Sequence, residues 1–380
     1  MNSPQANAQD IDVNKLVEDN DTGGRKPGPV VARLLLVIAV TWSLFQLWIA
    51  SPLPFALGVF VLNDTESRAI HLTFAVFLAY MAYPASKRSP SSHIPIQDWV
   101  LALVGAFCAG YLFWFYRDLA TRPGMPTSMD VYAAGVGVLL LLEATRRVLG
   151  LPMVIVAAVF LTYTFVGPYM PDMLAHRGAS VDRAASHFWL TTEGVFGVAL
   201  GVSSGFIFLF VLFGSLLDKA GAGNYFIKSA FALLGHMRGG PAKAAVVSSA
   251  ATGIISGSSI ANVVTTGTFT IPLMKRVGYR GDQAGAVEVS SSVNGQIMPP
   301  VMGAAAFLMV EYVGIPYVQV MKHAFLPAII SYIALFYIVH LEALKAGMQG
   351  LPRRNPSTGT QRLLSFLLTV SGFIVLAGIT

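Results

Sequence analysis

Ten separate apolar stretches limit what this chain can fold into more than any other feature. A helix needs about 20 apolar residues to cross a hydrocarbon core about 30 Å thick, and these stretches meet or approach that length. They cover residues 31–50, 69–85, 99–116, 131–145, 152–169, 199–217, 244–274, 284–313, 325–341 and 363–379. We therefore predict an all-α polytopic membrane protein with about ten membrane segments.

Composition excludes the common soluble classes. Hydrophobic residues make up 54% of the chain and charged residues only 12%, which is far from the balance of a soluble domain. The net charge is +6, but the basic residues lie between apolar runs and form no stripe, so we expect membrane lipid and no nucleic acid as a partner. Residues 1–29 are polar and lack a cleavable signal, and they are predicted to be a disordered cytoplasmic tail.

Basic residues also predict the orientation, because lysine and arginine in short loops resist translocation. With the N-terminus inside, 19 of the 25 basic residues fall on the inside. The other six lie outside, at Arg68, Arg117, Arg122, Arg177, Arg183 and Lys322. This bias favours a cytoplasmic N-terminus in a bacterial-type inner membrane.

The stretch 244–274 has basic residues on both flanks, with Lys243 before it and Lys275 and Arg276 after it. As one helix it would measure roughly 47 Å, at about 1.5 Å per residue, which is too long for one crossing and too short for two. We predict a re-entrant hairpin of two half-length helices. Its tip would be formed by Ser256, Gly257, Ser258 and Ser259, with Asn262 following.

A hairpin tip inside a membrane leaves backbone groups without helical partners, so it must line a cavity walled by protein or water. Hydroxyl, amide and carbonyl oxygens suit a monovalent cation, and helix N-terminal N–H groups suit a carboxylate. The alternative is that these small residues only allow two helices to pack closely.

The next stretch, 284–313, is predicted to be a broken helix, because a polar run and two prolines interrupt it. Its candidate binding residues are Ser292, Asn294, Gly295 and Gln296, followed by Pro299 and Pro300. Glu288, deep in the same stretch, is a further candidate. The alternative is a proline kink with a purely structural role.

Four motifs in these two segments and before them carry a resemblance to a known family. They are GHMRGGPAKA at 235–244, SGSSIAN at 256–262, GTFTIPLM at 267–274 and NGQIMPPVMG at 294–303. From about residue 191 to 346 the chain resembles the large membrane subunit of tripartite ATP-independent periplasmic (TRAP) transporters. These four motifs are most similar to those of the fused type of permease that works with TAXI-type solute-binding proteins.

The resemblance implies a domain order. Residues 30–150, which include the motif EATRR at 143–147, resemble the small four-helix subunit fused in front. A connecting helix and periplasmic loop at 151–190 would follow, then the first repeat of the large subunit at 191–346. Residues 347–380 would be a linker and the start of a further membrane helix. Because only one of the family's two inverted repeats is found, we expect a fragment or a truncated product.

The resemblance also implies the mechanism, which is an elevator-type symporter driven by sodium that accepts an organic acid from a periplasmic binding protein. The residues of the hairpin tip and of the broken helix would contact sodium and substrate, and Pro299 and Pro300 would hold the break open. The transported sodium would be the coupling ion, and no tightly bound cofactor is expected.

Two other function classes compete with this interpretation. An intramembrane serine hydrolase would use Ser258 as nucleophile, but it needs a histidine base, and the nearest intramembrane candidates are His323 and His340. A non-transporting remnant, scaffold or passive channel is the other class. The seven histidines lack metal-ligand spacing, so no resident metal site is predicted. Glu143 is expected to form an interfacial ion pair with Arg146 and Arg147.

Overall fold

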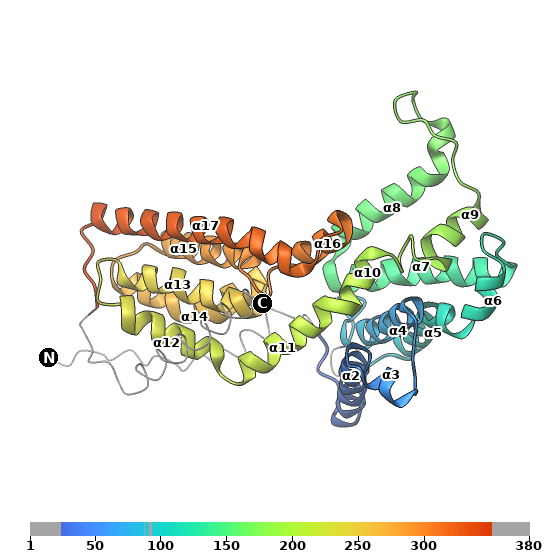
Figure 1. Ribbon diagram of the computed structural model, residues 1–380, viewed down its shortest axis with the longest axis horizontal. Helices are drawn as coiled ribbons and strands as arrows, with labels where there is room; N and C mark the ends of the chain where they lie inside the picture. The colour runs from blue at the N-terminus through green and yellow to red at the C-terminus, as the bar shows by residue number, and fades with distance from the viewer. Residues whose placement is uncertain (1–23, 87, 91–92, 352–380) are drawn as a thin grey trace. The chain divides into compact units, whose positions relative to one another are not determined.

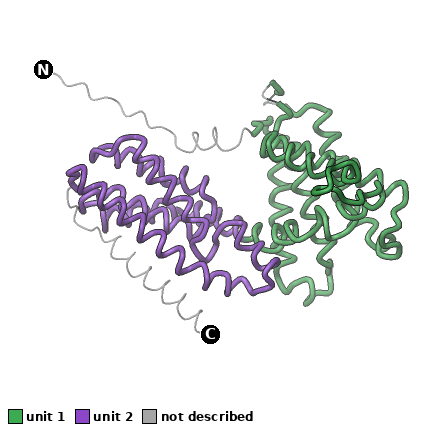
Figure 2. The backbone as a smooth tube through the Cα atoms, turned by 90° about the horizontal axis from the view of Figure 1, so that it is seen from above, with its two compact units in different colours: residues 1–209 green, residues 210–380 purple. Residues whose placement is uncertain are grey.

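The computed structural model describes residues 24–86, 88–90 and 93–351, and every regular element in these ranges is helical. The chain forms two compact units, residues 1–209 and 210–380, coloured separately in Figure 2. Each unit is described by itself. The predicted segment at 363–379 and residues 1–23 of the predicted tail lie outside the described residues. The domain boundaries expected from the sequence stay a prediction.

Unit 1 contains the helices at the blue and green end of Figure 1. In chain order they are α2 (Pro29–Ala50), α3 (Leu53–Leu57), α4 (Asp64–Ala82), α5 (Ile96–Trp114), α6 (Tyr116–Thr121), α7 (Ser128–Leu149), α8 (Leu151–Val166), η1 (Gly167–Tyr169), α9 (Val181–Ala185), η2 (Ser186–Leu190), α10 (Val198–Val202) and η3 (Ser203–Ile207). The segments η2 and η3 are π-helical. Helix α11 (Phe208–Lys219) runs from this unit into the next.

Two long helices of unit 1 begin at capping boxes. In a capping box the side chain of the N-cap residue accepts from the backbone N–H three residues later, and the side chain of that later residue accepts from the backbone N–H of the N-cap residue. Asn63 and Glu66 form the box that starts α4, and Thr127 and Asp130 form the one that starts α7. These pairs fix where each helix leaves its loop, because the first N–H groups of a helix have no partner within it.

The core of unit 1 lies between α4, α5 and α7 and is completed by Trp189 from η2. Trp189 is 1% exposed, and its indole N–H donates to the carbonyl of Cys108, 3.0 Å away. Its ring lies against Gly137, where a Cβ atom would come within 2.3 Å of the ring. Residues after α8 therefore pack into the same core as the first long helices.

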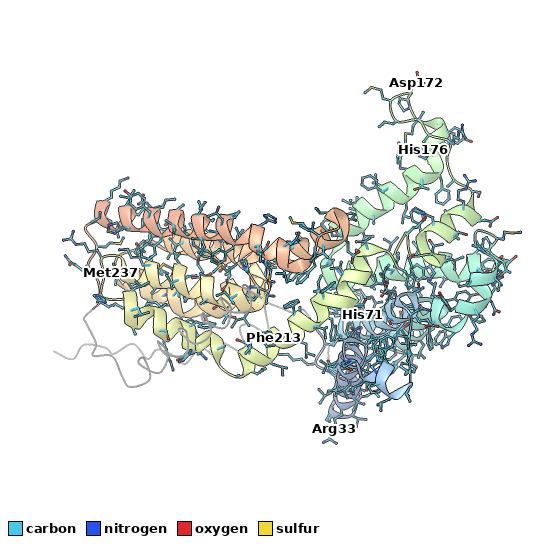
Figure 3. The ribbon with its side chains drawn as sticks, viewed as in Figure 1. Arg33, His71, Asp172, His176, Phe213 and Met237 are labelled. Atoms are coloured by element: carbon cyan, nitrogen blue, oxygen red, sulfur yellow. The ribbon has the colours of Figure 1, made fainter. Side chains whose placement is uncertain are left out.

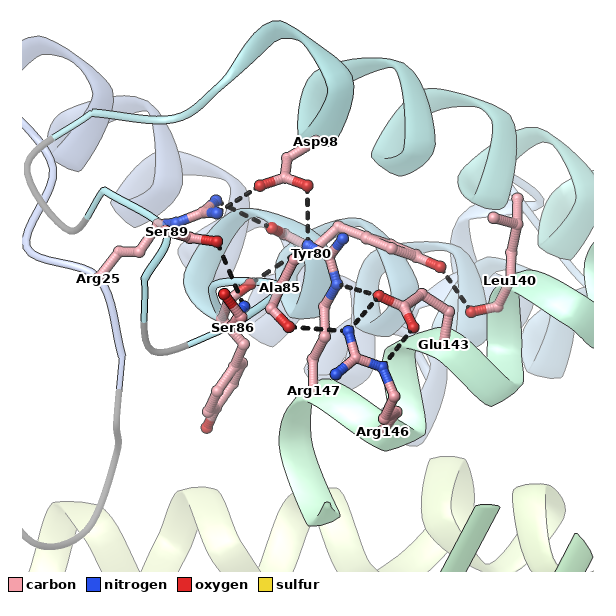
Figure 4. Close-up of polar contacts among 11 residues, drawn as sticks. Arg25, Tyr80, Ala85, Ser86, Ser89, Asp98, Leu140, Glu143, Arg146 and Arg147 are labelled. Carbon is pink, nitrogen blue, oxygen red and sulfur yellow. Dashed lines mark hydrogen bonds and ion pairs between the residues drawn. The ribbon is translucent and has the colours of Figure 1, made fainter. Parts of the chain in front are cut away.

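A network of ion pairs ties the ends of α4, α5 and α7 together, as Figure 4 shows. Glu143 accepts from Arg146 at 2.7 Å and from Arg147 at 2.8 Å, so the predicted ion pair is confirmed. The network extends beyond it, because Arg147 also reaches Asp98 at 2.9 Å and Arg25 pairs with the same carboxylate. Arg25 and Asp98 are both buried, and the pair holds the segment before α2 against the helix ends.

His71 on α4, labelled in Figure 3, joins α2 to α4 through polar contacts. Its Nδ1 lies 2.6 Å from the side-chain nitrogen of Gln46 and 3.2 Å from Trp42 Nε1, and its Nε2 lies 3.2 Å from the hydroxyl of Ser203. Two donors at Nδ1 leave Nε2 as the nitrogen that carries the proton. His71 is thus a satisfied histidine of this core.

Unit 2 contains the remaining helices, from yellow to red in Figure 1. They are α12 (Ala222–Leu234), α13 (Gly240–Ser256), α14 (Ser259–Arg276), α15 (Gly281–Asn294), the 3₁₀ turn η4 (Gly295–Ile297), α16 (Ala304–Val313) and α17 (Tyr317–Lys345). Helices α13, α14 and α15 pack against one another in all three pairs, and α17 packs on α13 and α15.

Six stretches of the described residues are helical, long and apolar enough to cross a membrane. They are α2, α5, α7, residues 151–169, residues 198–219 and α17. Each overlaps one of the ten predicted segments, and five contain theirs in full, whereas the segment predicted at 99–116 runs two residues past the end of α5. A seventh predicted segment falls in α4, whose first turns carry Asp64, Glu66 and Arg68. Two more are the hairpin and the broken helix, so the count of about ten stays a prediction.

The first hairpin helix begins four residues before the predicted segment. Gly239 has a positive φ of 64° and directly precedes α13, so Lys243 lies in the first turn of the helix and is 1% exposed. Its ammonium group lies 3.0 Å from Nδ1 of His340 on α17. Lys243, predicted from the sequence to lie just before the hairpin, is therefore a buried residue of its first helix.

The contact between Trp189 and Gly137 generates a stability prediction for unit 1. Gly137→Ala should lower the free energy of unfolding by about 1–3 kcal/mol, because a Cβ atom overpacks a buried ring. The matched control is Gly135→Ala on the same helix, where a Cβ atom meets nothing within 4 Å. Thermal unfolding in detergent measures both, and equal effects of the two substitutions would contradict the packing described.

Candidate functional site

The hairpin predicted from the sequence is present as α13 and α14, joined by a two-residue break. Gly257 ends α13 with a φ of 60°, a conformation that favours glycine. Ser258 caps α14, where its hydroxyl accepts from the backbone N–H of Ala261 at 3.3 Å. The backbone N–H of Ser258 in turn faces the hydroxyl of Ser256 at 3.4 Å. The polar tip is therefore ordered by its own side chains.

The predicted broken helix is also present, and it breaks before its prolines. Helix α15 ends at Asn294, η4 follows, and α16 begins only at Ala304. Pro299 and Pro300 lie in the turn between them and are joined by a cis peptide bond. The hydroxyl of Tyr317, from α17, lies 2.7 Å from the carbonyl oxygens of both Pro300 and Val301, and its one proton is shared between them. Helix α17 therefore satisfies carbonyls that the break leaves outside any helix.

The two interrupted segments meet at a pair of glycines. A Cβ atom on Gly253 of α13 would lie 2.7 Å from the Cα atom of Gly295, and one on Gly295 would lie 3.0 Å from Nδ2 of Asn262. Only residues without a side chain allow two backbones to come this close. The last turn of α13 therefore crosses directly over the break that follows α15.

A second set of contacts joins the hairpin tip to the turn after the break. A Cβ atom on Gly257 would lie 1.9 Å from the carbonyl oxygen of Met302, a residue that itself has a positive φ of 53°. Gln296 donates from Nε2 to the hydroxyl of Ser259 at 2.7 Å. The structure thus brings residues of both predicted groups together, and their roles stay a prediction.

Asn262 is the most deeply buried of the candidate polar side chains in the hairpin, at 1% exposed. Its Nδ2 donates to the carbonyl of Ser249 on α13 at 2.9 Å, which fixes how the amide is turned. Its Oδ1 is buried and, among the described residues, accepts no hydrogen bond. A buried acceptor without a partner lowers the free energy of unfolding by about 1–3 kcal/mol. An unsatisfied oxygen at this position therefore indicates a function, such as binding a ligand.

Beneath the break lies a polar layer that sequence reasoning largely missed. Glu288 of α15 is fully buried and contacts the hydroxyls of Thr266 and Thr270 on α14. Ser292, a predicted site residue, lies 3.2 Å from the hydroxyl of Ser249 and 3.5 Å from Glu288. The spacing of Thr266 and Thr270, one helical turn apart, was the available signal, but it does not reveal which helix they face.

The site is built from neutral oxygen atoms and exposed tip residues. In the described ranges no three His, Cys, Asp or Glu side chains gather in a way that could hold a metal ion. Ser258 is exposed, and no histidine of the described residues forms a hydrogen bond with it, so nothing here supports a nucleophile. Hydroxyl and amide oxygens beside a helix break suit a weakly held monovalent cation.

The contact between Gly257 and Met302 can be tested by one substitution. Gly257→Ala should lower the free energy of unfolding by at least about 2 kcal/mol, because it combines a positive φ with a clash against backbone. Gly285→Ala on α15, which meets nothing within 4 Å, should stabilise the protein slightly and is the control. A Gly257→Ala protein as stable as the wild type would show that the tip does not abut this turn.

Comparison with known proteins places these segments in a family. The sequence profile described as tripartite ATP-independent periplasmic transporter, DctM component, matches residues 136–380. This range covers more than half of the chain and contains the hairpin, the break and all the candidate site residues. The family is one of transporter permeases and not of enzymes.

Curated relatives carry names that agree with the profile. The chain is 34% identical over 91 residues to the C4-dicarboxylate TRAP transporter large permease protein DctM of Rhodobacter capsulatus, covering 24% of this chain and 21% of that protein. It is 26% identical over 171 residues to the sialic acid TRAP transporter large permease protein SiaM of Vibrio cholerae, covering 45% and 40%. It is 30% identical over 95 residues to the ectoine TRAP transporter large permease protein TeaC of Halomonas elongata, covering 25% and 22%.

The aligned part spans between about a fifth and two fifths of the length of these relatives. The profile match, which carries the assignment, covers the whole of unit 2 and the end of unit 1. With six stretches long and apolar enough to cross a membrane, the chain is a multi-pass membrane protein, and it belongs to the DctM family of tripartite ATP-independent periplasmic transporter components.

Proposed function

We propose that this chain supplies membrane permease segments of a binding-protein-dependent secondary active transporter in a bacterial inner membrane. The transporter imports an organic acid together with a cation, which we take to be sodium. Unit 2 holds the residues that contact both. The protein partner is a periplasmic solute-binding protein, of the TAXI type by the resemblance of the motifs. Residues 30–150 would take the place of the small membrane subunit.

The observation that carries this proposal is the unpartnered Oδ1 of Asn262. Folding leaves this acceptor buried without a hydrogen bond, at the crossing of the hairpin and the break. An amide oxygen is a good ligand for a hard monovalent cation, and cation binding would recover the free energy lost by burying it. The hydroxyls of the tip and the carbonyls freed by the break would supply further oxygens.

The carboxylate of the substrate has a different complement at the same place. Helix α14 begins at the tip with Ser258 as its cap, and the first N–H groups of a helix carry a partial positive charge. An anion near these groups and a cation near Asn262 would partly neutralise each other. Such a pairing supports symport of the two, because each would bind more tightly in the presence of the other.

The names of the relatives support an acid without selecting one. The names give C4-dicarboxylate, sialic acid and ectoine as the substrates of those three proteins. The small polar residues of the tip fit many carboxylates, so we propose the substrate only as a class. The elevator movement and a second, inverted repeat are part of the same proposal, and they rest on the resemblance of the motifs.

Asn262→Ala tests the proposed cation ligand. In the complete transporter, with its binding protein present, this substitution should raise the sodium concentration for half-maximal uptake about five- to thirtyfold, because one oxygen ligand worth about 1–2 kcal/mol is lost. Uptake of radiolabelled substrate into proteoliposomes at graded sodium concentrations measures it. The control is Asn224→Ala, an exposed asparagine of α12 in the same unit.

Asn294→Ala tests the contribution of the broken helix separately from that of the hairpin. Asn294 ends α15 and is half-buried, and we expect its loss to raise the same sodium concentration. An unchanged sodium dependence would remove Asn294 from the site and leave Asn262 as the ligand. Uptake that is independent of sodium in the wild type would reject the proposed coupling ion and favour another cation.

A further inference from the structure

Glu288 occupies an unusual place for an acidic side chain. It lies in the third turn of α15, is fully buried, and contacts α14 through the hydroxyls of Thr266 and Thr270. Within α15, the hydroxyl of Ser292 faces the same carboxyl group at 3.5 Å. Among the described residues, every polar contact of this carboxyl is therefore made to a neutral hydroxyl group.

No basic side chain of the described residues forms an ion pair with Glu288. Charged groups on the helices packed around it are engaged elsewhere or exposed. Lys243 of α13 contacts His340 of α17, and Asp282 pairs with Arg280. At the end of α14, Lys275 and Arg276 are exposed. The hydroxyl of Tyr332 donates to the carbonyl of Ser291 at 2.8 Å. Burying an ionised carboxylate without a counter-charge is very costly.

Both threonine hydroxyls beside Glu288 also lie near carbonyl oxygens of their own helix. Thr266 Oγ1 lies 2.8 Å from the carbonyl of Asn262 and also contacts Glu288, and Thr270 Oγ1 lies 3.0 Å from the carbonyl of Thr266 and also contacts Glu288. Each hydroxyl has one proton to donate. The two carbonyls already accept backbone N–H groups within α14, so both hydroxyls are free to donate to Glu288, and it is the missing counter-charge that favours a neutral carboxyl group.

The contacts of Glu288 also close a ring through the candidate site. From Glu288 the ring passes through Thr266 to the carbonyl of Asn262, and Asn262 Nδ2 donates to the carbonyl of Ser249 at 2.9 Å. The hydroxyl of Ser249 lies 3.2 Å from that of Ser292, which returns to Glu288. The ring joins α13, α14 and α15, and Asn262 is a member of it.

We propose that Glu288 is a positioning residue: as an uncharged carboxyl group it closes this ring, holds α14 on α15, and fixes Asn262 with its free oxygen at the break. The ring holds the second helix of the hairpin and the first half of the broken helix together as one piece. Glutamine at this position keeps the shape and a donor, and leucine keeps only the volume.

Hydrogen–deuterium exchange of the purified chain in detergent tests the ring without any transport assay. Glu288→Leu removes the side-chain hydrogen bonds between α14 and α15 and should speed exchange of the backbone amides in both helices about ten- to a hundredfold. Glu288→Gln should exchange like the wild type. So should Asp282→Asn, the matched control, which removes an exposed carboxylate from the same helix.

Two results would overturn the proposal. Exchange in Glu288→Gln as fast as in Glu288→Leu would mean that an ionised carboxylate is required, and unchanged exchange in Glu288→Leu would mean that no ring holds the helices. If Glu288→Leu fails to fold, Thr266→Val and Thr270→Val replace it, because valine keeps the shape of threonine without the hydroxyl. Each should then speed exchange, and neither doing so would count against the ring.

Positioning of Asn262 by Glu288 should also change sodium binding, which holding the helices together would not by itself change. This expectation rests on the proposed function. In the complete transporter Glu288→Leu should raise the sodium concentration for half-maximal uptake about tenfold, and Glu288→Gln should restore it. An unchanged sodium requirement in Glu288→Leu would overturn the role. Sodium-independent uptake in the wild type would reject the proposed function, and the exchange result would still decide on the ring.

Discussion

The close approach of Gly253 and Gly295 is the contact on which the rest of unit 2 depends. A single Cβ atom on Gly253 would come within 2.7 Å of the other backbone, so no side chain separates the end of α13 from the break after α15. Because the two segments cross this closely, Asn262 on α14 lies against both of them, beside Gly295 and hydrogen-bonded to the carbonyl of Ser249 on α13. The burial of its free oxygen, the contact of Gly257 with Met302 and the layer around Glu288 all follow from this crossing.

The polar groups of unit 2 contrast with those of unit 1 in how they are satisfied. In unit 1, charges meet charges: Arg25 and Arg147 pair with Asp98, and two arginines pair with Glu143. These networks hold helix ends in place, and the one nitrogen among them that is buried without a partner in the described residues, Arg25 Nε, is a donor and not an acceptor. In the hairpin of unit 2, neutral groups form the contacts and one acceptor is left over. That difference is why we place the binding function in unit 2.

Sequence reasoning could find the interrupted helices but not the contacts between them. The stretch at 244–274 had the wrong length for any whole number of crossings, and glycine and serine at its centre marked the tip, so Gly257 and Ser258 could be predicted. The prolines marked a break, yet α15 ends earlier, at Asn294, because η4 turns the chain before them. Arg25 and Asp98 are 73 residues apart, and no local pattern pairs them. Glu288 was visible as a buried acid, but its partners depend on which faces of α14 and α15 meet.

If the crossing of the hairpin and the break binds a cation through Asn262, a structure of the complete permease in lipid nanodiscs should show it most directly. Electron cryo-microscopy maps should be recorded once with sodium and once with an organic cation too large to bind in its place. We expect a density feature beside Asn262 Oδ1 that is present only with sodium. Identical maps around Asn262, with its Oδ1 hydrogen-bonded to a group of the protein, would contradict the account.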